Sequence, residues 1–272
     1  SRHHSHVTER YAYIQWIADG QLRESCKTLK QDGIALVGDE PFLVAEDSSD
    51  VWANQPLYRF DCSVGAPPDE FSATGQDWGL PPYRWERMAE RDYEFFRQRA
   101  KRSAQFFDTV RIDHVVGLYR TYHRPRDGSE AFFLPGEEDS QRKQGESILR
   151  SFSDSGLDLL AEDLGVIPRF VRDSLWEMAI PGFKVFFWEK FEGSLQRSEG
   201  WPDRSIATSG THDTPSLRQW WQALNEHERR DVLRLWEAEP PKQGPGLHWD
   251  DHIHGQLLRF LYASPSNLLL LP

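Results

Sequence analysis

Short apolar runs alternate along this chain with longer segments whose apolar positions repeat at helical spacing. The runs predict strands at 33–39, 110–113, 156–161, 182–188, 205–209 and 267–271. The longer segments predict helices at 10–29, 85–107, 168–178, 217–224, 226–236 and 252–263. Because strands and helices alternate, the pattern favours a parallel sheet covered by helices.

One connection departs from this regular alternation. Residues 40–83 are long for a link between a strand and a helix, and they are rich in Pro, Gly, Asp and Trp. Loops of that length are usually functional or disordered. The aromatic residues in this segment favour an ordered loop with a function.

The strand count suggests a particular architecture. A closed barrel of parallel strands and helices has eight strands, and this pattern supplies about six. We therefore predict an α/β fold, an incomplete (β/α)8 TIM barrel with long βα-loop insertions. Residues 1–272 are expected to form one partial catalytic domain, with the first strands and the extreme C-terminal part of the barrel lying outside the chain.

Acidic residues follow three of the apolar runs. Asp113, Glu162 and Asp213 each come directly after a run or within a few residues of one. A barrel brings the carboxyl ends of its strands to one face, so these side chains are expected in one pocket. Glycosidic bond chemistry needs such convergent carboxyl groups. A single acid among 43 would carry little weight, but three in this pattern indicate carbohydrate chemistry.

Charge and aromatic content narrow the class of substrate. The formal net charge is −11, which opposes binding to nucleic acids or anionic membranes, because either requires a basic surface. A neutral substrate fits better. The chain has 11 Trp, 8 Tyr and 16 Phe; such rings either line a sugar-binding cleft or fill the core, and composition alone leaves both open at each position.

The remaining composition bears on the compartment of the protein, and no cofactor is expected. Only Cys26 and Cys62 are present, which is too few for a disulfide framework. No apolar stretch is long enough to span a membrane, and residues 1–20 lack the layout of a signal peptide. We therefore expect a soluble, cytoplasmic protein of undetermined oligomeric state.

No metal or nucleotide site is expected. His3, His4 and His6 lie together near the terminus, where solvated side chains are the usual case. Glycine-rich phosphate-binding motifs are absent from the sequence.

Several motifs resemble those of a known family. They lie at 38–41, 47–53, 65–69, 75–79, 111–117, 161–166 and 210–213. Arg-Ile-Asp-His at 111–114, Ala-Glu-Asp-Leu-Gly at 161–165 and Thr-His-Asp at 211–213, in that order, are the most specific. From about residue 10 to 272 the chain resembles the amylomaltase or 4-α-glucanotransferase family, glycoside hydrolase family 77 of the α-amylase clan.

The resemblance implies a role for each carboxylate. Asp113 matches the nucleophile, Glu162 the general acid/base, and Asp213 the third carboxylate, which binds sugar hydroxyls. Arg111 lies two residues before Asp113 on one strand, so both side chains face the same way and the cation favours the ionised carboxylate. Strand alternation alone does not choose between Glu162 and Asp163; the resemblance favours Glu162.

It also implies a set of substrate-binding residues. His114 and His212 match positions that contact the sugar before the scissile bond, and Arg111 belongs to the same site. The family's active-site loop is matched by Asp69, Phe71, Gln76 and Trp78. A loop that excludes water favours a sugar acceptor over hydrolysis.

The expected reaction is transfer of α-1,4-glucan segments to the 4-hydroxyl of an acceptor glucose or maltooligosaccharide, with retention of configuration. Two alternatives remain open from the sequence. One is an α-1,4-glucan hydrolase of the same clan, because both reactions share a covalent intermediate. The other is a truncated, non-catalytic glucan-binding remnant.

Overall fold

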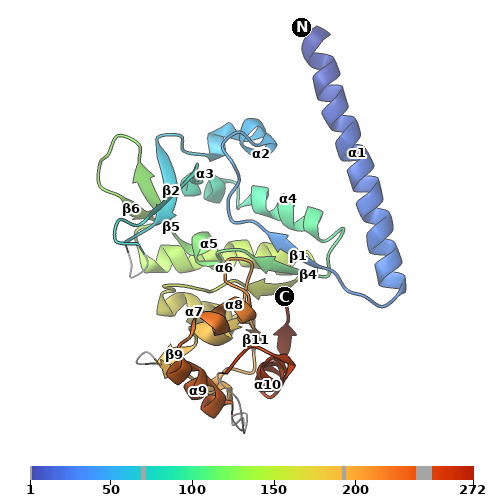
Figure 1. The fold of residues 1–272 in the computed structure, drawn as a ribbon. Helices are drawn as coiled ribbons and strands as arrows, with labels where there is room; N and C mark the ends of the chain where they lie inside the picture. Colours follow the sequence, from blue (N-terminus) through green and yellow to red (C-terminus); the bar gives the residue numbers. More distant parts are fainter. Residues whose placement is uncertain (1, 69–71, 192–193, 237–246) are drawn as a thin grey trace. The chain divides into compact units, whose positions relative to one another are not determined.

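The computed structural model describes residues 2–68, 72–191, 194–236 and 247–272 of a chain that divides into two compact units. The first unit is Ser1–Ser174 and the second is Leu175–Pro272. Each unit contains three parallel strands joined through helices (Figure 1). The predicted alternation of strands and helices is thus confirmed within each unit.

The parallel strands of the first unit are β1 (Val37–Glu40), β4 (Thr109–Ile112) and β7 (Asp158–Ala161). Glu40 pairs with Ile112, and Ile112 pairs with Ala161, so the three strands end in register. Buried side chains such as Val110 and Leu159 anchor them in the core. The residues that follow these strands therefore lie at one edge of the sheet.

The first strand starts later than its apolar run predicts. Residues 33–36 are not strand, because they close the end of the preceding helix α1 (Arg2–Gln31). The amide of Ile34 donates to the carbonyl of Leu29, and Gly33 has a φ of +74°. Strand pairing consequently begins at Val37.

The single helix predicted for 85–107 is two helices. They are α3 (Trp85–Glu90) and α4 (Glu94–Ser103). Asp92 and Tyr93 between them have φ values of +47° and +51°. Two consecutive left-handed residues end a right-handed helix, so the chain turns there although its apolar spacing is continuous.

The segment 40–83 is ordered, but it is not a loop as predicted, because it contains regular elements. It contains α2 (Ser49–Ala53), the 3-10 turn η1 (Gln55–Leu57), β2 (Cys62–Ala66) and β3 (Gln76–Leu80). These strands join β5 (Thr121–Pro125) and β6 (Phe132–Leu134) in an antiparallel sheet of order β3-β2-β5-β6 (Figure 1). One of the two partners of β2, β5, lies about sixty residues downstream, where no local pattern marks it.

Three more helices complete the elements up to the end of the first unit. They are α5 (Val116–Tyr119), α6 (Glu138–Ser153) and α7 (Arg169–Glu177), the last running into the second unit. The buried face of α6 includes Ile148, Leu149 and Phe152 and packs against α4 and α5. This packing holds α5, the helix that follows the turn after β4, from one side.

The second unit repeats the pattern. Its parallel strands are β8 (Gly182–Val185), β11 (Ser205–Thr208) and β12 (Leu268–Leu270), in the order β8-β11-β12. Its helices are α8 (Leu217–Ala223), α9 (Glu226–Leu235) and α10 (Asp251–Tyr262). Short elements lie between β8 and β11: η2 (Phe186–Trp188), β9 (Lys190–Phe191), β10 (Ser194–Leu195) and η3 (Ser198–Gly200).

An aromatic cluster fills the core of the second unit. The rings of Phe186, Trp236 and Phe260 contact one another, and Trp221 stacks on Trp236. The strand predicted at 182–188 ends at Val185, because Phe186 turns into this cluster instead of continuing the sheet. Many of the aromatic residues counted in the sequence therefore serve packing.

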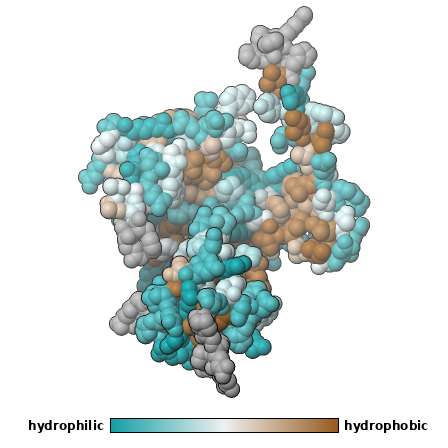
Figure 2. Space-filling model, in the orientation of Figure 1, coloured by the Kyte–Doolittle hydropathy of each residue, from teal (hydrophilic) through white to brown (hydrophobic). Residues whose placement is uncertain are grey.

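Helix α1 carries apolar side chains on its surface. Tyr11, Ile14 and Trp16 are 67%, 46% and 70% exposed, and Figure 2 shows hydrophobic residues along this helix. Across the part of the chain that the structure describes, no helix is both long and apolar enough to cross a bilayer.

Candidate active site

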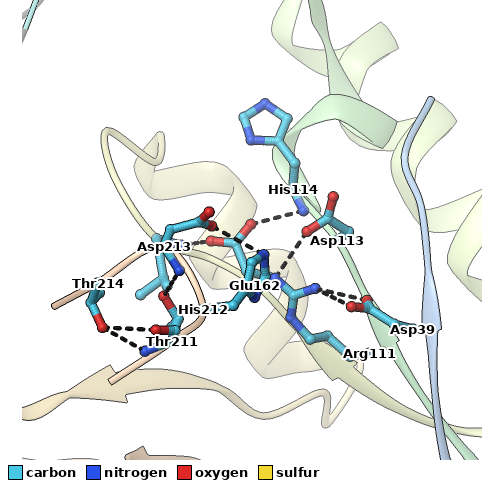
Figure 3. Close-up of polar contacts among 10 residues, drawn as sticks. Asp39, Arg111, Asp113, His114, Glu162, Thr211, His212, Asp213 and Thr214 are labelled. Carbon is cyan, nitrogen blue, oxygen red and sulfur yellow. Dashed lines mark hydrogen bonds and ion pairs between the residues drawn. The ribbon is translucent and has the colours of Figure 1, made fainter. Parts of the chain in front are cut away.

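Asp113 lies just past the end of β4 and is held by an arginine. Arg111 Nη2 is 2.9 Å from Asp113 Oδ1, and its Nη1 donates to both carboxylate oxygens of Asp39 at 2.7 and 2.8 Å (Figure 3). The Asp113 amide donates to the carbonyl of Glu40 across the sheet. The expected contact between Arg111 and Asp113 is present.

The charge state of Arg111 follows from the two carboxylates that it contacts, Asp39 and Asp113. Burial acts to lower the pKa of Arg111, but the carboxylates of Asp39 and Asp113 outweigh that effect and the pKa is raised. The guanidinium therefore stays charged. It presents a fixed positive charge to the Asp113 carboxylate at 2.9 Å.

Asp39 was not among the residues predicted for the site. It lies on β1, opposite Arg111 in the strand register. Its only sequence signal is membership of the Gly-Asp-Glu-Pro motif at 38–41, because the contact joins residues 72 positions apart.

Glu162 lies at the equivalent place on the neighbouring strand. Its amide donates to the carbonyl of Ile112, and its own carbonyl accepts from Val115. The carboxylate accepts backbone N–H groups from His114 at 2.8 Å and from Leu164 at 3.2 Å (Figure 3). These bonds fix the carboxyl group next to the turn that carries Asp113.

The two carboxyl groups differ in environment. Burial raises the pKa of Glu162; the amide of His114 and the charge of Arg111 oppose the rise, and the charge of Asp113 adds to it. The side chain of Asp113, in contrast, is 42% exposed and contacts Arg111. Glu162 thus has a raised pKa, and its neighbour Asp113 is held by a cation. This arrangement fits a general acid paired with a nucleophile.

His114 contacts both Glu162 and the antiparallel sheet, through its amide and its ring respectively. Its backbone has a φ of +45°, a conformation that costs a residue with a side chain roughly 1–3 kcal/mol. Its ring packs edge-to-face on Trp78 at 5.0 Å and lies 5.5 Å from Phe42. Burial lowers the pKa of His114 to about 4, so the ring is neutral at pH 7.

Two of the four predicted loop residues, Gln76 and Trp78, belong to the described part of the chain. Trp78 is on β3 and donates its indole N–H to the side chain of Gln76 at 2.9 Å. The structure thus brings Trp78 next to His114 and Gln76 next to Trp78. Asp69 and Phe71 lie outside the described residues.

Asp213 and His212 lie in the second unit, in the turn after β11. The Asp213 amide contacts the Thr211 hydroxyl at 3.3 Å, and Thr214 Oγ1 bonds the Thr211 backbone at 2.8 and 2.9 Å (Figure 3). His212 Nε2 is 3.3 Å from Asp213 Oδ2, and both side chains are largely exposed. The turn therefore presents the Asp213 carboxylate to solvent at the carboxyl end of a parallel strand.

No candidate metal centre accompanies these carboxylates. Within residues 2–68, 72–191, 194–236 and 247–272, no three His, Cys, Asp or Glu side chains are grouped so as to hold a metal ion.

Comparisons with known proteins agree with this fold. The amylomaltase of Streptococcus agalactiae, solved in complex with acarbose, has a TM-score of 0.79 and 24% identity over 94% of this chain and 52% of its own. The Corynebacterium glutamicum amylomaltase has a TM-score of 0.76 and 24% identity, covering 95% of this chain and 42% of its own. The predicted incomplete (β/α)8 barrel is confirmed.

The chain is also similar in sequence to proteins curated as 4-alpha-glucanotransferases. The 4-alpha-glucanotransferase of Streptococcus pneumoniae serotype 4 is 33% identical over 271 residues, which are 96% of this chain and 50% of that protein. The Chlamydia muridarum 4-alpha-glucanotransferase is 31% identical over 262 residues, 95% of this chain and 48% of that protein. The chain spans about half the length of the curated relatives it matches.

The model of glycoside hydrolase family 77, described as 4-alpha-glucanotransferase, matches residues 1–272. With its full length matched and its strand-end motifs in place, the chain belongs to the 4-alpha-glucanotransferase family.

Proposed function

We propose that this chain carries catalytic groups of a 4-α-glucanotransferase that works by retaining double displacement. The observation that supports it best is the pair of carboxylates at the ends of adjacent strands. Asp113 is held by Arg111, whereas Glu162 is partly buried and its pKa is raised. Retaining glycoside chemistry needs one ionised nucleophile and one protonated acid.

In the first step, an oxygen of Asp113 attacks the anomeric carbon of the donor glucan. The glycosidic bond breaks as Glu162 gives its proton to the departing 4-oxygen. The products are a glycosyl ester on Asp113 and a shortened glucan with a free 4-hydroxyl. Arg111 holds the Asp113 carboxylate through the contact between its Nη2 and Asp113 Oδ1.

In the second step, the now ionised Glu162 removes the proton from the 4-hydroxyl of an acceptor glucose or maltooligosaccharide. The acceptor oxygen displaces Asp113 and forms a new α-1,4 bond. Two inversions give net retention. Transfer requires that a sugar reach the ester before water does. An aromatic side chain such as Trp78 over the site would support transfer by excluding water.

We assign substrate binding to Arg111, His114, His212, Gln76, Trp78, Asp69 and Phe71, and the role of third carboxylate to Asp213. The contact between Trp78 and His114 supports a sugar-facing role for both, because a neutral imidazole and an indole suit an uncharged ligand. The complex of the related S. agalactiae amylomaltase with acarbose supports glucan or maltooligosaccharide as the ligand class.

The deciding experiment compares products from maltotriose. The longest natural protein that contains this segment is assayed beside its Asp113→Ala variant. Glucose together with a ladder of longer maltooligosaccharides, absent from the variant, is the result expected of a transferase that uses Asp113.

Other product patterns would point to the alternatives. Shorter sugars alone, with a net gain of reducing ends, would identify a hydrolase of the same clan. A folded protein that binds maltooligosaccharides without turnover would instead favour the glucan-binding remnant. In a crystal structure with ligand, a separation between the Asp113 and Glu162 carboxyl groups well above about 5.5 Å would contradict retention.

A further inference from the structure

The amide that binds the general acid/base comes from a residue in an unusual conformation. His114 donates its N–H to Glu162 Oε2 at 2.8 Å while its φ is +45°. A left-handed φ at His114 turns the chain away from the extended path of β4, so the peptide that carries this N–H opens a turn. The bond to Glu162 therefore depends on what holds this turn in place.

Phe42 is placed to do this. Its ring is 4% exposed and lies 5.5 Å from the His114 ring, and its backbone carbonyl accepts the Tyr83 hydroxyl at 3.1 Å. That bond ties the Phe42 backbone to the core. The ring is thereby kept under the turn that His114 begins.

Gly117 supplies the space for the ring. Its amide donates to the His114 carbonyl at 2.8 Å and so closes the turn. A Cβ atom at Gly117 would lie 2.5 Å from the Phe42 ring, which is closer than real contacts allow. The ring therefore fits against the turn only because residue 117 has no side chain.

We propose that Phe42 is a positioning residue: by filling the space between Gly117 and the His114 ring, it holds the His114 amide on the carboxylate of Glu162. Phe42 does not touch the reacting atoms. The assignment rests on the proposed function for its catalytic meaning, but the contact itself can be measured without turnover.

Loss of the His114 donor would shift the pKa of Glu162 in one direction. An N–H donor stabilises the ionised carboxylate, so losing it raises the pKa of Glu162. Within the first unit, the charged groups that act on Glu162 are Arg111 and Asp113. Neither is altered by a substitution at Phe42, and His114 is neutral above its pKa of about 4.

The test uses Phe42→Leu in the longest natural protein that contains this segment, with Phe260→Leu as the matched control. Phe260 is also buried but belongs to the second unit, where it packs on Phe186, Trp201 and Trp236. For Phe42→Leu, the alkaline limb of kcat/KM should move up by about one pH unit and kcat should fall, with KM little changed. Phe260→Leu should keep the wild-type limb, as should any merely structural loss.

A second variant and a second measurement separate the proposed effect from a general loss of folding. Gly117→Ala should act like Phe42→Leu by displacing the ring. The NMR signal of the His114 amide should follow the titration of Glu162 in the wild type and lose that dependence in both variants. An unchanged alkaline limb and an unchanged amide titration in folded Phe42→Leu would overturn the proposal.

The two proposals fail in different ways. A wild-type protein that does not transfer glucan would refute the proposed function. The His114 amide titration would still decide whether Phe42 holds the contact to Glu162.

Discussion

At the scale of single residues, the site depends on a chain of charges from Asp39 through Arg111 to Asp113. We predict that Asp39→Asn lowers kcat/KM by about tenfold to a hundredfold. The amide retains one acceptor oxygen but turns an NH₂ group toward Arg111, so one of two bonds and the charge are lost. Initial rates of maltotriose disproportionation measure the effect.

Asp61 provides the control for this substitution. It forms a similar two-bond pair with Arg59 at 2.8 and 3.2 Å, outside the proposed site. Asp61→Asn should leave kcat/KM within about twofold, since exposed ion pairs contribute little. Equal losses in both variants would indicate a general effect on folding.

The second prediction at this scale concerns pH and stability. The pKa of Glu162 is raised above its usual 4.5, so folding favours its protonated form. Its contribution to stability is complete below pH 4.5 and is lost as pH rises through the raised pKa. The free energy of unfolding of the wild type, relative to Glu162→Gln, should therefore fall with rising pH in this window.

Urea unfolding at a series of pH values measures this difference. The exposed Glu130→Gln serves as the control. A difference between wild type and Glu162→Gln that stays flat or grows with pH would show that burial does not govern this carboxyl group.

At the scale of elements, the pairing of β2 with β3 positions Trp78. Gly65 on β2 faces the backbone of β3 so closely that a Cβ atom would lie 1.9 Å from the Gln76 carbonyl. Gly65→Ala should therefore displace the hairpin, cost about 1–3 kcal/mol of stability, and lower transfer more than hydrolysis. Denaturant unfolding and product ratios from maltotriose are the measurements.

Gly136→Ala is the matched control, because nothing lies within 4 Å of a Cβ atom there. It should change stability by no more than about 0.5 kcal/mol. If Gly65→Ala behaved in the same way, the hairpin would tolerate displacement and Trp78 would not depend on this pairing.

At the scale of the whole molecule, the exposed apolar residues of α1 should govern how residues 1–272 behave when produced alone. Large exposed apolar patches promote association. We expect this polypeptide to bind a hydrophobic dye and to self-associate, and Ile14→Lys with Trp16→Glu to reduce both. Dye fluorescence and sedimentation are suitable measurements.

Trp52 of α2 tests whether an exposed apolar residue must lie on α1 to promote association. It is 78% exposed, but it lies away from α1 in the sequence and belongs to another helix. Trp52→Glu should change association little. A polypeptide that stays monomeric with all of these residues intact would contradict the prediction.

Much of the barrel could be predicted because its signals are local. Apolar runs followed within a few residues by Asp113, Glu162 and Asp213 mark strands and their carboxyl ends, since both burial and side-chain alternation act over a few residues. Breaks at Asp92 and Tyr93 could not be predicted, because the apolar spacing of 85–107 continues through them. Nor could the antiparallel sheet, in which Val64 pairs with His123.

The sequence by itself determined the order of strands and helices and the acids that follow the strands, because these depend on neighbouring residues. Only the tertiary structure decided which groups meet. The register of Ile112 with Ala161 brings Glu162 to the turn of His114, and the register of β1 with β4 gives Arg111 its second carboxylate. Such contacts join residues about fifty to seventy positions apart, and their energies depend on burial and geometry that no local pattern contains.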